Sequence, residues 1–283
     1  MQNEWRMERE MDIYKKIAEE LAISTWQVEA VVRLIDEGNT IPFIARYRKE
    51  QHGTLNDEQL RNLDERLSYL RNLEDRKETV LSSIEEQGKL TDDLRKQILA
   101  AQTQVELEDL YRPYRPKRRT RATIAKEKGL EGLADIILLQ KTDRTPEEEA
   151  EPYIDAEKGV ASAEEAVQGA MDILAEAIAD KADYRMAIRK VTADKGILVS
   201  TAKDPEEKSV YENYYEFESS ISKLSGYQVL AINRGEKEKL LTVKIQAPEE
   251  EILRYLSKKI IVREQGAMAD CLVRTIEDSY SRL

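Results

Sequence analysis

The feature that most constrains the fold is a long, uninterrupted helical pattern in the first third of the chain. Four leucines, spaced three, four and three residues apart, lie on one face of it: Leu60, Leu63, Leu67 and Leu70. Asn56 or Asp57 can cap its start, and Gly88 ends it. A helix over residues 57–87 would be roughly 45 Å long. Such a helix is typical of a spine, so we expect a mainly α-helical fold.

Helical spacing also precedes this spine, in a helix-turn-helix-like unit at about residues 8–55. Ser24 is the predicted N-cap of its second helix, and Gly38 ends that helix. The side chains that this helix would offer to a DNA groove are net negative: Gln27, Glu29, Arg33, Asp36 and Glu37. We therefore expect the unit to pack against other parts of the protein, and not to read DNA.

The composition excludes several classes of protein. Charged residues make up 36% of the 283 positions, and there are only 11 glycines and 7 prolines, which is typical of long charged helices. One cysteine and one histidine exclude an internal disulfide and argue against a Cys/His metal site, so no metal or cofactor is expected. No apolar run is long enough to span a bilayer, and no secretory signal opens the chain. We expect a cytoplasmic protein without a membrane partner.

Positive charge is concentrated in one short stretch, residues 112–128. Eight lysines and arginines face a single acid there, a net of +7 in a protein of net charge −11. Pro113 and Pro116 cannot both lie inside a helix, so we expect an ordered or extended loop. Arginine matches phosphate geometry, and Tyr and Arg planes can stack on bases. The candidate phosphate or nucleic-acid contacts are Arg112, Arg115, Lys117, Arg118, Arg119 and Arg121.

An internal electrostatic latch explains the same charge equally well. Residues 143–183 hold thirteen acids and only three basic residues, a net of −10, and the basic stretch could dock on them. Between the two interpretations, we expect Arg118 and Arg119 to be latched and Arg121 to be exposed.

A second, smaller basic patch consists of Arg46, Arg48 and Lys49, on a short helix predicted over residues 43–49. His52 follows it without a nucleophile or acid motif, so we expect a loop residue and not a catalyst. The sequence contains no glycine-rich phosphate loop, no hydrolase elbow and no zinc-protease motif. We therefore do not expect an enzyme.

The pattern of apolar residues changes from helical spacing to short apolar runs near residue 225. Apolar runs at 229–233 and 240–245 flank a charged turn and predict a β-hairpin over 229–245. Further helices are predicted from Pro248 and from Ala267, the second with Cys271 as inert packing on its apolar face. That last pattern reaches the final residue without a cap, which predicts a continuation in a longer protein. We expect a helical region over 1–200 and a mixed segment over 201–283.

Four stretches of the chain resemble bacterial transcription accessory proteins of the Tex family. They are TIPFIARYRKEQHGTL (40–55), ELEDLYRPYRPKRRTRATIAKEKGLEGLA (106–134), EKGVASAEEAVQGAMDILAE (157–176) and VLAINRGEKEKLLTV (229–243). Their order fits, and the resemblance spans about residues 10–283, the N-terminal part of a Tex protein. One departure is that Tyr227 and Gln228 stand where the family commonly has a His-Arg pair.

The resemblance implies a function that this chain shares with domains outside it. Tex proteins are related to a eukaryotic transcription elongation factor, and they continue into an RNase H-like YqgF domain, helix-hairpin-helix elements and an S-one-type barrel that binds nucleic acid. The chain would then be a scaffold that positions these RNA-binding domains, with RNA or DNA as the partner. The alternative is an acidic helical interaction module that docks the transcription machinery. We expect the chain itself to be monomeric.

Overall fold

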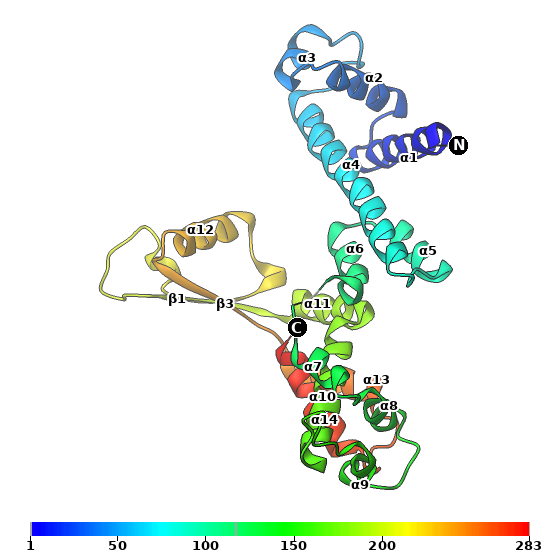
Figure 1. The fold of residues 1–283 in the computed structure, drawn as a ribbon. Coiled ribbons are helices and arrows are strands. Elements are labelled where there is room, and N and C mark those ends of the chain that lie inside the picture. Colours follow the sequence, from blue (N-terminus) through cyan, green and yellow to red (C-terminus); the bar gives the residue numbers. More distant parts are fainter. Residues whose placement is uncertain (1, 117, 283) are drawn as a thin grey trace. The chain divides into compact units, whose positions relative to one another are not determined.

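The computed structural model describes residues 2–116 and 118–282, which form two compact units. The N-terminal unit ends at Leu107, and the C-terminal unit begins at Glu108. The predicted mainly α-helical class is confirmed, because the described residues form fourteen helices and one three-stranded antiparallel sheet (Figure 1). No helix in these two ranges is both long and apolar enough to cross a membrane.

The N-terminal unit is assembled on the predicted long helix, α4 (Asp57–Glu86). Asn56 caps it, because its side chain accepts a hydrogen bond from the backbone N–H of Gln59 at 2.8 Å. The predicted leucine face is buried. It packs against helices from both sides of α4 in the sequence: α1 (Gln2–Leu21), α2 (Thr25–Asp36), α3 (Ile41–Tyr47) and α5 (Asp92–Ala100).

The turn between α1 and α2 follows local sequence signals. Ser24 is the N-cap of α2 and forms a capping box with Gln27, as its position predicts. Gly38 has a φ of 86° just after the helix, a conformation that glycine adopts at little cost. The two helices pack against each other and against α4, so the helix-turn-helix-like pair contributes to the core of its unit.

The helical part of the C-terminal unit is centred on α10 (Ala163–Asp180). Figure 1 shows α14 beside it, and α10 also packs against α7, α8, α9 and α11. The remaining helices of this part have the following bounds: α7 (Arg121–Glu127), α8 (Glu131–Leu139), α9 (Pro146–Ala150), α11 (Ala182–Lys195), α13 (Glu249–Ile260) and α14 (Ala269–Ser281). The boundary between the two units falls within α6 (Gln104–Tyr111). Cys271 is buried in this core, and burial raises the pKa of its thiol to about 11, which fits inert packing.

The predicted β-hairpin over 229–245 is wrong, because its first half is helical. α12 (Gly226–Lys237) starts with a capping box between Ser225 and Gln228, and its Ile232 is buried. A short apolar run fits a buried helix face as well as a strand, and here the cap decides for the helix.

The second half of that segment is a strand with a distant partner. β3 (Leu241–Gln246) pairs antiparallel with β1 (Ile197–Ala202), which also pairs with β2 (Glu216–Ser220) in the order β2-β1-β3. α12 packs against β3. A Cβ on Gly235 would lie 2.6 Å from Leu241 Cδ1, so glycine permits the close approach of helix and strand.

Candidate nucleic-acid interface

The basic stretch 112–128 is only partly the loop that its prolines predict. A short 3-10 turn covers Arg112–Tyr114, and the described residues between it and α7, at 115, 116 and 118–120, form no helix or strand. From Arg121 onward the loop prediction is wrong, because α7 begins there: the hydroxyl of Thr120 accepts a hydrogen bond from the backbone N–H of Thr123 at 3.0 Å. Lys117, one of the predicted contacts, lies outside the described residues.

Two arginines of the stretch are held by acids of α10. Arg112 Nε lies 3.0 Å from Asp180 Oδ1, and Arg121 Nε lies 3.4 Å from Asp172 Oδ1. Both carboxylates belong to the acidic segment 143–183, and both side chains are only 10% exposed. The latch therefore exists in part, as contacts between the basic stretch and the predicted acidic segment.

The latch uses different arginines from those expected. Arg121 is exposed, as expected, with a side chain that is 63% accessible, but it is also ion-paired with Asp172, because the cap at Thr120 begins a helix that packs against α10. Arg119 instead pairs with Glu127 of its own stretch at 2.7 Å. Arg118 forms no ion pair with any described residue and is exposed. The expected latching of Arg118 and Arg119 onto the acidic segment is wrong, whereas the expected exposure of Arg121 is confirmed.

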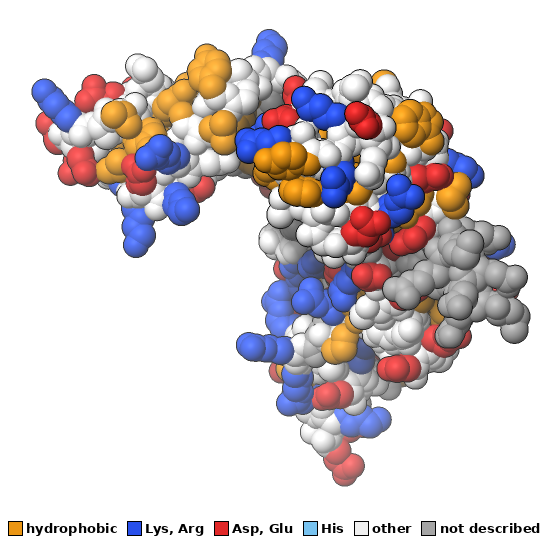
Figure 2. Space-filling view, turned by 90° about the horizontal axis from the view of Figure 1, so that it is seen from above, with side chains coloured by type: hydrophobic (Ala, Val, Ile, Leu, Met, Phe, Trp, Pro, Cys, Tyr) orange, Lys and Arg blue, Asp and Glu red, His pale blue; other side chains and the backbone are white. Residues whose placement is uncertain are grey.

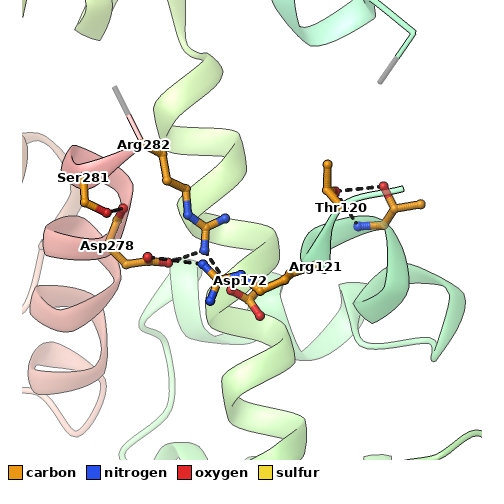
Figure 3. A network of polar contacts seen from close by, with 7 residues as sticks. Thr120, Arg121, Asp172, Asp278, Ser281 and Arg282 are labelled. Atoms are coloured by element: carbon orange, nitrogen blue, oxygen red, sulfur yellow. Dashed lines mark hydrogen bonds and ion pairs between the residues drawn. The ribbon is translucent and has the colours of Figure 1, made fainter. Parts of the chain in front are cut away.

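Arg121 belongs to a four-member network that joins α7, α10 and the C-terminal end of α14 (Figure 3). Asp172 accepts a hydrogen bond from Arg282 at 2.8 Å, and Asp278 pairs with both Arg121 and Arg282. Two carboxylates thus face two guanidinium groups. Sequence reasoning missed Asp278 and Arg282, since neither stands in a motif or a charge run.

Among the described residues of the stretch, few basic groups remain available to a phosphate. Arg115 and Arg118 are exposed, and within residues 2–116 and 118–282 neither has an ion-pair partner. Arg112 and Arg121 would have to give up carboxylate contacts first. The structure therefore reduces the described candidates in this stretch to Arg115 and Arg118, with Arg119 held only by an exposed local pair.

The second patch has a different environment, on and just after α3. Arg48 lies over the ring of Phe43, with its guanidinium carbon 5.0 Å from the ring centre, and Arg46 lies 6.0 Å from the ring centre of Tyr47. Neither arginine, nor Lys49, forms an ion pair with the residues that the structure describes. His52 lies in the following turn, as predicted, and its buried Nδ1 accepts a hydrogen bond from the N–H of Leu55 at 3.2 Å.

Two family models match this chain on either side of the basic stretch. The Tex-like protein N-terminal domain matches residues 11–85, and the Tex central region-like model matches residues 141–277. The chain belongs to the Tex family. The Tex N-terminal match covers most of α1 to α4 and includes the patch at Arg46, Arg48 and Lys49, whereas the Tex central match includes Asp172 and Asp180.

Individual relatives agree with this Tex assignment. The uncharacterized protein YdcI of Bacillus subtilis is 47% identical over 98% of this chain and 39% of its own length. The transcriptional accessory protein Tex of Neisseria gonorrhoeae is 42% identical over 83% of the chain and 31% of its own length. The human S1 RNA-binding domain-containing protein 1 is 30% identical over 98% of the chain and 29% of its own length. The chain thus spans less than two-fifths of these curated relatives.

Proposed function

We propose that this chain is the N-terminal and central scaffold of a nucleic-acid-associated transcription accessory factor in the cytoplasm. It positions RNA-binding domains that a longer Tex protein carries, and it acts without a catalytic step. The observation that carries the proposal is the pairing of Arg112 and Arg121 with Asp180 and Asp172, because it commits basic charge to internal packing. The net charge of −11 further disfavours strong binding of nucleic acid by this chain alone.

The test compares residues 1–283 with a full-length Tex protein that contains them. Fluorescence anisotropy with labelled RNA and DNA at about 150 mM salt should give the shorter chain a Kd of roughly 10⁻⁴ to 10⁻⁶ M, the non-specific range. The full-length protein should bind more tightly. Nanomolar, sequence-selective binding by residues 1–283 alone would contradict the scaffold proposal.

Reversing Arg121 and Arg118 separately should distinguish latch from contact. Arg121→Glu places a carboxylate beside Asp172 and Asp278, and should lower the free energy of unfolding by about 1–2 kcal/mol, because an attraction becomes a repulsion on a partly exposed side chain. Arg118→Glu is the matched control, since it makes the same charge change without a described ion pair. It should change stability by less than about 0.5 kcal/mol and weaken the residual nucleic-acid binding. Urea unfolding and anisotropy measure the two effects. Equal stability of both variants would refute the latch.

A further inference from the structure

We infer that the patch on α3 is a binding site for single-stranded nucleic acid, at which a base stacks on Tyr47 while Arg46, Arg48 and Lys49 meet the phosphates. This inference deepens the proposed function and rests on it, because it gives the N-terminal unit a direct contact with the strand that the longer protein handles. Three properties of the patch carry it: unpaired charge, exposed aromatic surface and a firm base.

The first property is positive charge without internal partners. Acids outnumber lysines and arginines by 56 to 45 in this chain, so nearby carboxylates are available to most cations. In the same unit Arg66 pairs with Glu20 and Arg71 pairs with Asp36. Arg46, Arg48 and Lys49 form no such pair within the described residues. Three adjacent cations left unneutralised in an acidic protein fit an anionic ligand.

The second property is aromatic surface that is open to a ligand. The side chains of Phe43 and Tyr47 lie one helical turn apart on α3, with ring centres 5.1 Å apart. The side chain of Tyr47 is 59% exposed, so its ring is open to a ligand. Bases stack on exposed aromatic rings and on guanidinium planes, and the arginines here already lie against the rings.

The third property is the firm base beneath these side chains. Ile44 and Ala45 of α3 are buried, and the turn that follows is fastened to α2. Gln27 Nε2 donates hydrogen bonds to the backbone oxygens of His52 and Gly53 at 3.1 and 3.3 Å.

The ring of Trp26 also lies against this turn. A Cβ on Gly53 would lie 2.6 Å from that ring, and Gly53 has a φ of 63°. Glycine is therefore needed here both for the close approach of the ring and for the left-handed backbone conformation. Trp26 itself is 54% exposed, which adds a second open ring beside the turn. A platform held in this way loses little conformational freedom when it binds.

The arrangement favours a single strand over other anionic partners. Figure 2 looks onto the end of the N-terminal unit that carries α3, where basic side chains flank hydrophobic ones. α3 has only seven residues, so the contact it offers is small. A stacking contact needs an unpaired base, which a duplex does not offer. The carboxylates of an acidic protein segment would pair with the cations, but they would gain no stacking from the π face of Tyr47.

Variants of residues 1–283 test this site by fluorescence anisotropy with labelled ten-residue oligo(U) and oligo(dT) at about 50 mM salt. Tyr47→Ala and Tyr47→Leu should each weaken binding at least about five-fold, since both lose the ring and leucine keeps apolar surface. Tyr227→Ala is the control, because Tyr227 is 71% exposed on α12, outside the patch, and should leave binding unchanged. Replacing Arg46, Arg48 and Lys49 by alanine should flatten the salt slope by about 2.

A second readout locates the contact directly. Ultraviolet crosslinking of 5-iodouracil oligonucleotides, followed by mass spectrometry, should identify Tyr47 or Phe43. Binding of either oligo(U) or oligo(dT) supports the site, and the tighter of the two shows whether the site prefers RNA or DNA. Unchanged binding of the oligonucleotides by both Tyr47 variants, or equal binding of a duplex, would overturn the inference. Displacement of the bound oligonucleotide by an acidic peptide would also overturn it. Weak binding that ignores Tyr47 leaves the scaffold proposal standing, whereas nanomolar binding by this chain refutes that proposal separately.

Discussion

Replacing Asp109 by alanine should lower the free energy of unfolding by about 3 kcal/mol. Asp109 lies at the end of α6 with a side chain that is only 6% exposed, and it accepts hydrogen bonds from Arg185 Nε and Arg189 Nη1 of α11, each at 2.8 Å. Arg185 is itself 14% exposed. Removal of the shared carboxylate leaves two neighbouring guanidinium groups with like charge, one of them poorly solvated. Urea unfolding measures the loss.

The control for Asp109 is Asp194→Ala on α11. Asp194 is exposed and forms no ion pair with the residues that the structure describes, so its removal should cost less than about 0.5 kcal/mol. A loss of similar size in both variants would show that the buried cluster contributes no special stability.

The contribution of Asp109 should also depend on pH with a definite sign. Burial alone would raise the pKa of this carboxyl, but the hydrogen bonds from Arg189 and Arg185 outweigh burial and hold it below its ordinary value. A lowered pKa in the folded state stabilises the protein above the unfolded pKa, and this stability is lost as pH falls through the folded pKa. The difference between wild type and Asp109→Ala should therefore stay constant down to about pH 5 and shrink below about pH 4.

The elements that the sequence predicted are those with local signals. Asn56 and Gln59 cap α4 across three residues, and Ser24 and Gln27 cap α2 in the same way. Such signals need no knowledge of the rest of the chain. The sheet lacks such local signals, because β3 pairs with β1 about forty residues earlier. The apolar run of α12, which lies between them in the sequence, fits a helix as well as a strand. The run Ile197–Ala202 and the alternation around Phe217 were the available strand signals.

The candidate site likewise has features that the sequence predicts and features that depend on how distant segments pack. Charge totals over 112–128 and 143–183 predicted that the two segments could meet, and Arg112 and Arg121 do pair with acids of α10. Which arginine pairs depends on where α7 begins and on how it packs, and charge totals contain neither. The patch at Arg46 and Arg48 was found from charge alone, whereas the four-residue spacing of Phe43 and Tyr47 was the unused signal of stacked rings.

Replacing Asp172 by alanine should cost about 3 kcal/mol of stability, because this carboxylate holds α7 and α14 to α10. Its side chain is 10% exposed and accepts from Arg282 at 2.8 Å. Arg282 is 22% exposed, and its Nε is buried without a hydrogen-bond partner in the described residues. Without Asp172, Asp278 is the one acid among the described residues that still pairs with the guanidinium of Arg282, which remains poorly hydrated. Thermal and urea unfolding of residues 1–283 measure the cost.

Two further variants separate this network from a general effect of charge on the helices. Glu277→Ala removes an exposed acid next to Asp278 on α14 and should change stability by less than about 0.5 kcal/mol. Adding Arg282→Met to Asp172→Ala should recover at least about 1 kcal/mol, because the double variant no longer buries an unpaired cation, and methionine keeps most of the apolar length. If the double variant is instead the sum of its two single losses, Asp172 and Arg282 act independently and the network does not hold the three helices together.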